Sequence, residues 1–267
     1  KFLLLLTLAA AWDYQTSGDD WSDTCKSGEE QSPIDVDTED YDVLGDNYRI
    51  EVYYYGKTAS RTLVNTGTYI YMEGDFGYIV VIDDDGDERK FLTEWVEFHM
   101  PSEHWFDGYS TDMEMQIFHR IDDSDYTVDF PSRAVVSVPI RPGDESYFMN
   151  SIDVYNLPAS GQSHKLPDNS NINLLAIVDM DDDYFHYKGS LNKPTCDEDI
   201  LWYIFETKQW VSLSQMENFK NLWIDNQSFS GGKGNVRAIQ DMNGRTLYYS
   251  TAARVGVVLA VLSWLVC

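Results

Sequence analysis

Short runs of β-branched and aromatic residues alternate with turn residues along the middle of the chain, and this pattern predicts strands. The pair Asp85-Gly86, between two apolar runs, indicates a hairpin. The expected strands cover residues 68–72, 78–82, 91–99, 114–119, 133–139 and 200–206. Helices are expected only at 144–155 and at 212–223, where Ser212 or Ser214 would cap the second. We therefore expect a mainly β fold with a few short helices, in one domain because no repeat or linker-like stretch divides the chain.

The two ends of the chain differ from this middle part. Residues 1–11 carry one positive charge, then an apolar run, then small residues, as a secretory signal peptide does. They offer no polar face, which argues against a buried N-terminal helix. The predicted divisions are thus a signal peptide at 1–11, a single domain at 12–249 and an apolar tail at 250–267.

The tail begins with small residues and continues as an apolar segment, 255–267, which is shorter than the about 20 residues needed to cross a bilayer. This order is typical of a glycosylphosphatidylinositol (GPI) anchor signal, although the spacer is short. A final core strand or helix is the alternative. We expect a secreted or extracellular surface protein, with membrane attachment through the C-terminus if the tail is an anchor signal.

Charge narrows the choice of partners. The chain has 19 basic and 45 acidic residues, a formal net charge of −26. Such a surface repels nucleic acid and anionic lipid, so no nucleic-acid partner is expected. A solvated acidic surface is the simplest explanation, but the acidic runs 83–87 and 179–183 leave calcium binding open. The first run lacks the glutamate at the twelfth position and the flanking helices of a helix–loop–helix calcium site.

The cysteines and one sequon fit a secreted chain. Of the three cysteines, Cys267 lies in the tail, which leaves Cys25 and Cys196 as an even pair. In an oxidising compartment such a pair predicts one disulfide. Asn226 begins the single glycosylation sequon, Asn226-Gln227-Ser228, so a glycoprotein is expected.

Several short motifs follow one another between about residue 12 and residue 245. They are WDY at 12–14, QSPID at 31–35, NTG at 65–67, FHMPSEH at 98–104, DME at 112–114, GSLNKPTC at 189–196, and Arg237 followed by NGR at 243–245. As an ordered set they resemble the α-type carbonic anhydrase family. The resemblance implies a central twisted, mostly antiparallel sheet of about ten strands, an active-site cone in its middle, and a disulfide between Cys25 and Cys196.

The resemblance also assigns the metal-ligand positions. Catalytic zinc takes three protein ligands and a water, and three neutral imidazoles leave the metal charge that lowers the pKa of this water to about 7. Residues two apart on a strand share a face, and the motif alignment places the three ligands at Glu97, His99 and Gln116. Only His99 is a histidine, and an amide oxygen such as that of Gln116 is a poor zinc ligand. We expect no metal cofactor; the alternative is zinc held by these three side chains with Glu114 as support behind them.

Other pocket positions are changed as well. Thr68 stands at the proton-shuttle position and cannot relay protons near neutral pH. Asn192 stands where the family orients the zinc hydroxide with a threonine, and Lys193 follows it. The pocket positions that keep the family's residue types are Glu103, Glu114, Tyr187, Leu191 and Trp202. These residues are either relict pocket walls or simply core.

The sequence is consistent with three functions. The first is a non-catalytic, carbonic-anhydrase-like secreted or surface protein (a pseudoenzyme) that acts in binding or assembly, with an unknown extracellular protein or with itself. The second is a residual carbonic anhydrase, with reversible hydration of carbon dioxide at a remodelled metal site. The third is an acidic, cation-binding extracellular protein.

Overall fold

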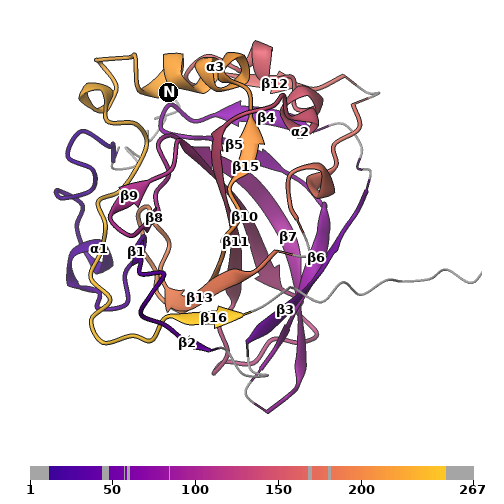
Figure 1. Cartoon of the computed structure of the whole chain (residues 1–267), viewed down its shortest axis with the longest axis vertical. Coiled ribbons are helices and arrows are strands. Elements are labelled where there is room, and N and C mark those ends of the chain that lie inside the picture. Colours follow the sequence, from indigo (N-terminus) through magenta and orange to yellow (C-terminus); the bar gives the residue numbers. More distant parts are fainter. Residues whose placement is uncertain are drawn as a thin grey trace, which may run out of the picture.

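The computed structural model describes residues 12–43, 48–56, 58, 61–83, 85–167, 170–179 and 182–250 (Figure 1). The predicted signal peptide at 1–11, the tail from 251 onward and Cys267 lie outside the described residues. Within the described part of the chain, none of the helices has the length and apolar character that a membrane crossing needs.

One large sheet of thirteen strands dominates the fold. Its continuous path runs through β12 (Ser163–Lys165), β4 (Thr62–Asn65), β5 (Ile70–Glu73), β7 (Glu88–His99), β10 (Met113–Ile121), β11 (Arg133–Pro142), β14 (Ile200–Phe205), β13 (Tyr184–Gly189), β16 (Tyr248–Ser250) and β2 (Asp42–Val43). Beside this path, β15 (Gln209–Val211) pairs with β11, and β6 (Gly77–Ile82) joins β3 (Arg49–Tyr54) to β7. Among the described pairs of this large sheet, only β11–β14, β11–β15 and β16–β2 are parallel.

The smaller elements lie around this sheet. A second sheet contains β1 (Asp35–Val36), β8 (Trp105–Phe106) and β9 (Tyr109–Ser110). The helices are α1 (Thr24–Ser27), α2 (Tyr147–Ser151) and α3 (Leu213–Trp223), with short 3-10 helices at Val154–Asn156, Leu174–Ala176 and Ser230–Gly232. In Figure 1, α2 and α3 lie together at one end of the large sheet, and α1 lies beside the small sheet.

The predicted mainly β, mostly antiparallel architecture is confirmed. Each of the six expected strands is present with shifted ends, and the predicted turn at 83–87 joins β6 to β7 as an antiparallel hairpin. The sheet has more strands than the about ten expected, because edge strands such as β2 and β12 are two and three residues long. Strands that short carry too few residues to show a period-2 pattern.

The helix predicted at 144–155 is wrong in its extent. Ser146 caps α2 by accepting a hydrogen bond from the amide of Met149, and the helix then ends at Ser151. Asp153 has a left-handed backbone (φ 56°), which a right-handed helix cannot contain. The helix predicted at 212–223 is confirmed as α3, and Ser212, not Ser214, is its cap.

Strands β7 and β10 bring the predicted ligand positions together. Because alternate residues of a strand face opposite sides, Glu97 and His99 share one face of β7. In the antiparallel register Glu97 lies opposite Gln116, and His99 lies opposite Glu114. The other face of the two strands supplies Phe98, Met115 and Ile117 to the main hydrophobic core.

His119 faces away from this site, as its odd separation from Gln116 predicts. Its Nε2 lies 3.0 Å from the hydroxyl of Tyr54, and the two rings stack. Its Nδ1 lies 3.2 Å from the carbonyl oxygen of Ala134. The imidazole is therefore a hydrogen-bonded core group on the far side of the sheet.

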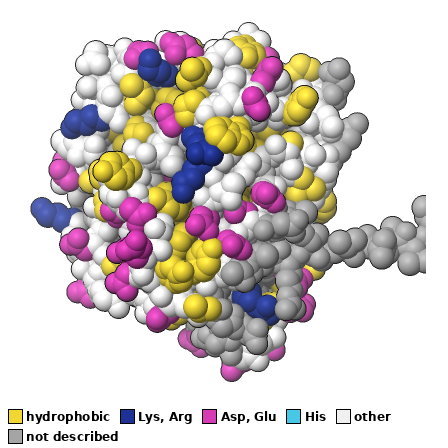
Figure 2. All heavy atoms as spheres, in the orientation of Figure 1, with side chains coloured by type: hydrophobic (Ala, Val, Ile, Leu, Met, Phe, Trp, Pro, Cys, Tyr) yellow, Lys and Arg dark blue, Asp and Glu magenta, His cyan; other side chains and the backbone are white. Residues whose placement is uncertain are grey.

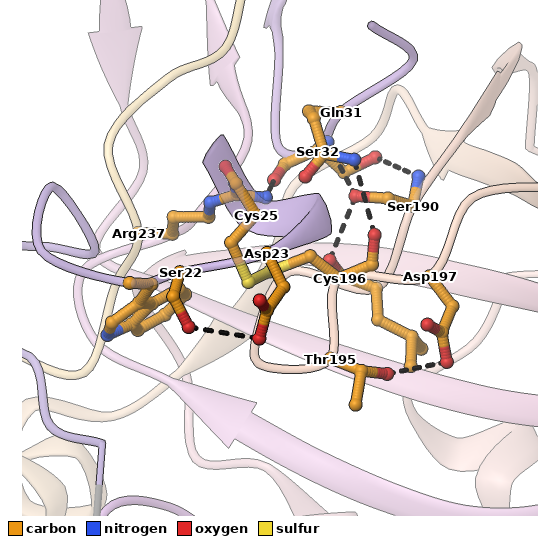
Figure 3. Close-up of a disulfide and its surroundings, with 12 residues drawn as sticks. Ser22, Asp23, Cys25, Gln31, Ser32, Ser190, Thr195, Cys196, Asp197 and Arg237 are labelled. Carbon is orange, nitrogen blue, oxygen red and sulfur yellow. Dashed lines mark hydrogen bonds between the residues drawn. A yellow bond between two sulfur atoms is a disulfide. The ribbon is translucent and has the colours of Figure 1, made fainter. Parts of the chain in front are cut away.

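The predicted disulfide is present. Cys25 of α1 and Cys196, in the loop after β13, are joined with an S–S distance of 2.08 Å (Figure 3). The amide of Cys196 also donates to the carbonyl of Lys193 at 2.8 Å. The bridge therefore fixes the loop that carries Asn192 and Lys193 to the N-terminal segment of the domain.

Candidate functional site

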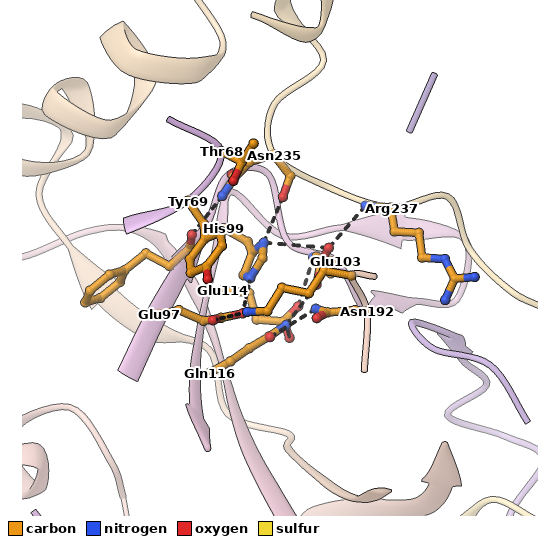
Figure 4. Close-up of polar contacts among 12 residues, drawn as sticks. Thr68, Tyr69, Glu97, His99, Glu103, Glu114, Gln116, Asn192, Asn235 and Arg237 are labelled. Atoms are coloured by element: carbon orange, nitrogen blue, oxygen red, sulfur yellow. Dashed lines mark hydrogen bonds and ion pairs between the residues drawn. The ribbon is translucent and has the colours of Figure 1, made fainter. Parts of the chain in front are cut away.

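The three expected ligand positions meet in the interior of the protein. Glu97, His99 and Gln116 are completely buried. Figure 4 shows their side chains converging with those of Glu103 and Asn192. Each of the three side chains is hydrogen-bonded to other groups of the protein.

His99 has partners at both ring nitrogens. Nδ1 lies 2.8 Å from the carbonyl oxygen of Asn235 and donates to it, and Nε2 lies 3.1 Å from Oε1 of Glu97. Nδ1 is also 3.6 Å from a carboxylate oxygen of Glu103. Burial alone would lower the pKa of His99, but the carboxylates of Glu103 and Glu97 outweigh it and raise this pKa to about 9. In this arrangement the ring is an imidazolium at neutral pH, and each of its nitrogens already has an oxygen partner in the protein.

Glu97 accepts hydrogen bonds from three side chains. Its Oε1 faces His99, and its Oε2 accepts from the indole nitrogen of Trp95 at 2.8 Å and from the ammonium group of Lys193. Burial would raise the pKa of this carboxyl group, but the charges of Lys193 and His99 lower it to about 2. Glu97 is thus an ionised carboxylate that the protein itself neutralises.

Lys193 places a second cation at the site. Its ammonium nitrogen lies 4.1 Å from the centre of the Tyr69 ring and 5.1 Å from that of Phe118. The indole of Trp95, at 5.7 Å, completes an aromatic enclosure around the charge. Only 8% of the residue is exposed.

Gln116 uses both ends of its amide. Its Nε2 donates to Glu103 at 3.1 Å and to Glu114 at 2.8 Å. Its Oε1 accepts from Nδ2 of Asn192 at 3.0 Å. Asn192, at the expected hydroxide-orienting position, is therefore hydrogen-bonded to Gln116, at the expected third ligand position.

Glu114 and Glu103 lie behind this group. Glu114 accepts from the amides of Glu103 and His104 and from the ring of His104 at 2.9 Å. Burial would raise its pKa, but His104 lowers it to about 2. Burial, together with the neighbouring Glu114 charge and against the effect of His99, raises the pKa of Glu103 to about 7. The two carboxyl groups therefore differ in charge although they are equally buried.

The remaining predicted pocket residues are parts of the same hydrogen-bonded and packed interior. Tyr187 bonds to Nε2 of His104 at 2.8 Å, and the indole of Trp202 donates to the carbonyl of Ser190 at 2.9 Å. Leu191 packs against a hydrophobic cluster that contains Tyr187 and Trp202. Thr68 stands apart, with its hydroxyl 3.0 Å from that of Thr66. Tyr187, Trp202 and Leu191 thus have hydrogen-bonding or packing partners in the interior, which fits either a relict pocket wall or the core.

The sequence did not assign any role to Lys193, Tyr69 or Trp95 in this site. Lys193 was recognised only as a changed neighbour of Asn192, and the two aromatic residues were not considered. One signal was available: a carboxylate at an interior strand position, Glu97, requires a cation near it. The sequence does not show which basic side chain lies near Glu97, because this depends on the path of the loop after β13.

The arrangement of these residues does not fit zinc. His99 donates from both nitrogens, Gln116 is engaged at both amide atoms, and an ammonium group lies against the carboxylate of Glu97. Among the residues that the structure describes, no group of three or more His, Cys, Asp or Glu side chains is arranged to hold a metal ion. No reaction step through a metal is therefore derived.

Comparison with known proteins agrees with the fold. The family model described as eukaryotic-type carbonic anhydrase matches residues 15–251. The chain belongs to this family. The family is normally zinc-dependent.

The relatives carry two kinds of name, carbonic anhydrase and dioscorin. The chain is 29% identical to carbonic anhydrase Nec1 of Nesocodon mauritianus over 229 residues, which cover 83% of this chain and 75% of the relative. It is 27% identical to dioscorin DB3L of Dioscorea polystachya over 235 residues, 85% of this chain and 77% of the relative. Among solved structures, the α-carbonic anhydrase of Thermovibrio ammonificans with sulfanilamide aligns at a TM-score of 0.72 with 26% identity, covering 89% of this chain and 98% of that one.

Other predicted sites have different outcomes. In the run 83–87, Asp83 forms an ion pair with Arg89 at 3.0 Å and accepts from the amides of Asp85 and Asp87, so its oxygens are already used. Parts of both acidic runs, at 84 and at 180–181, lie outside the described residues. Asn226 is partly exposed, with its Nδ2 3.3 Å from the carbonyl of Leu222, and its glycosylation stays a prediction.

Proposed function

We propose that this chain is a non-catalytic member of the carbonic anhydrase family, which uses the fold for binding or assembly outside the cell. One observation carries the proposal: the side chains at the three ligand positions already have partners within the protein. Glu97 contacts His99 and Lys193, and Gln116 bonds to Glu103 and Asn192. Hydration of carbon dioxide needs neutral imidazoles on a metal and a metal-bound hydroxide. An imidazolium, an amide and a neutralised carboxylate offer none of these.

The proposed location and partners rest on separate features. The disulfide between Cys25 and Cys196 supports an oxidising, extracellular compartment. Acidic side chains are spread over the face that Figure 2 shows, in keeping with the net charge of −26. This charge opposes binding to nucleic acid. It leaves an extracellular protein or a second copy of the chain as the proposed partner.

The test is to measure metal content and activity together. The purified protein should contain less than one equivalent of zinc by elemental analysis, and carbon dioxide hydration should stay at the uncatalysed rate in stopped-flow assays, with and without added zinc. A zinc-loaded carbonic anhydrase serves as the positive control for the hydration assay. Hydration that a chelator abolishes and zinc restores would contradict the proposal.

A further inference from the structure

Three buried carboxyl groups lie close together around His99. Glu97, Glu103 and Glu114 are each at most 1% exposed. An uncompensated charge in the interior is strongly unfavourable, so each ionised carboxylate needs a cation or several donors. Glu114 has His104 and two amides, and Glu103 has His99 nearby and the amide of Arg237. For Glu97 the partner that comes from outside its own strand is Lys193.

The loop after β13 holds Lys193 in this position from both sides. On one side, Asn192 donates to Gln116 on β10. On the other, the carbonyl of Lys193 accepts from the amide of Cys196, which the disulfide ties to α1. The side chain therefore starts from a backbone that is fixed within a few residues in each direction.

The aromatic enclosure adds a second constraint. Tyr69, Phe118 and Trp95 surround the ammonium group, and Trp95 also donates to the same carboxylate oxygen that Lys193 contacts. The negative faces of aromatic rings attract a cation and shield it from water. The site thus holds one positive charge that is covalently part of the chain.

We infer that Lys193 is a tethered replacement for the metal ion: its ammonium group neutralises Glu97 and excludes divalent cations from the site. The inference rests on the proposed non-catalytic function and explains how the interior remains stable without a metal. It also implies a latent cation site. Without the ammonium group, Oε2 of Glu97 would keep only the indole of Trp95 as a donor, so this carboxylate oxygen could accept a metal cation in place of the ammonium.

The test replaces Lys193 with methionine, which keeps the length of the side chain and removes its charge. Lys193→Met should unfold at a lower temperature than wild type, and zinc should raise that temperature. Zinc affinity, measured by competition with a chromophoric chelator, should rise by about tenfold or more, the range that the surroundings of a metal ligand control. Wild type should show neither response to zinc.

Lys188→Met is the matched control. Lys188 also places its ammonium over a tyrosine ring, 4.7 Å from the centre of Tyr48, and bonds to its hydroxyl. No carboxylate partner of Lys188 is found in the described part of the chain. This variant should leave both zinc affinity and its response to zinc at the wild-type level. An equal response in the two lysine variants would overturn the inference.

A double variant covers the case in which Lys193→Met does not fold. Lys193→Met with Glu97→Gln removes both charges, so it should be more stable than Lys193→Met alone and should not respond to zinc. If the double variant is as unstable as the single one, Lys193 acts through packing and the inference fails. Zinc-dependent hydration by wild type would instead overturn the proposed function, so the two failures are distinguishable.

Discussion

At the scale of single residues, the interior tolerates charge because every charged group has a specific partner. The carboxylate of Glu97 receives an ammonium, an indole and an imidazolium donor, and its pKa falls to about 2. Gln116 contributes no charge, but its amide joins Glu103 and Glu114 to Asn192. Removing one member leaves a buried group unsatisfied, which is more costly than never having buried it.

Two other buried histidines predict how stability depends on pH. His119 and His186 lie in the core, and burial lowers the pKa of each to about 3 from the usual 6.5. Between these values the unfolded chain binds protons at both rings and the folded chain does not. The contribution of these two histidines to the free energy of unfolding should therefore be largest above about pH 6.5 and should fall as the pH drops toward 3.

His186→Phe tests this dependence, because it keeps a ring to stack on Tyr203 and removes the titrating group. Urea unfolding at about pH 7 and about pH 5 should show a smaller loss of stability for the variant than for wild type. Glu114 protonates in the unfolded chain at lower pH and contributes little in this window. Glu103, whose pKa burial raises to about 7, titrates in this window with the opposite sign, but it does so in both proteins and does not affect their difference. Equal losses in both proteins would show that His186 does not carry the effect.

At the scale of elements, the pairing of β7 with β10 decides which side chains meet. The register places Glu97 opposite Gln116, and a slip of β10 by one residue would turn the Gln116 side chain to the core face. The helices depend on single caps in the same way. Ser212 accepts from the amide of Gln215 at 3.3 Å, and the Gln215 side chain bonds back to the Ser212 amide.

The cap of α3 gives the second prediction. Ser212→Ala should lower the free energy of unfolding by about 1 kcal/mol, because the first turn loses the side-chain acceptor of its capping box. Ser214→Ala is the control: its hydroxyl lies 3.0 Å from that of Ser212 but caps no amide, so its effect should stay within about 0.5 kcal/mol. Urea titrations of the three proteins give both values. The reverse order of effects would place the cap at Ser214.

At the scale of the whole molecule, the disulfide connects distant parts of the chain. Cys25 and Cys196 are 171 residues apart in sequence, and the bridge joins the N-terminal aromatic cluster of Tyr14 and Trp21 to the loop that carries Lys193. The large sheet supplies the two cores on its faces. The disulfide therefore fixes the middle of a loop that the sheet holds only at its two ends, through β13 and β14.

Removal of the disulfide gives the third prediction. Cys25→Ser with Cys196→Ser should lower the free energy of unfolding by about 2–5 kcal/mol, because the unfolded chain regains the freedom that the bridge removes. Urea unfolding under non-reducing conditions measures this, with Cys267→Ser in all proteins so that no third thiol contributes. Dithiothreitol should destabilise the Cys267→Ser reference and leave the disulfide-free variant unchanged. Labelling of both cysteines in the native, non-reduced protein would contradict the prediction.

The sequence by itself determined the family, the mainly β fold and the disulfide, and it predicts where the altered ligand positions lie. These follow from local signals: period-2 strands, an Asp-Gly turn, and motifs such as FHMPSEH whose order is specific. The sequence did not indicate that the helix predicted at 144–155 ends early. Asp153 adopts a left-handed backbone conformation there, and this conformation depends on the residues that pack around it.

Only the tertiary structure decided how the altered site is satisfied. Lys193 lies 96 residues from Glu97 in sequence, and nothing local pairs them. Their contact requires the β7–β10 register, the course of the loop after β13 and the anchor at Cys196 together. Strands and turns depend mainly on neighbouring residues, so the sequence indicates them. An ion pair between distant residues depends on where the loops lie in the folded protein, so the sequence does not indicate it.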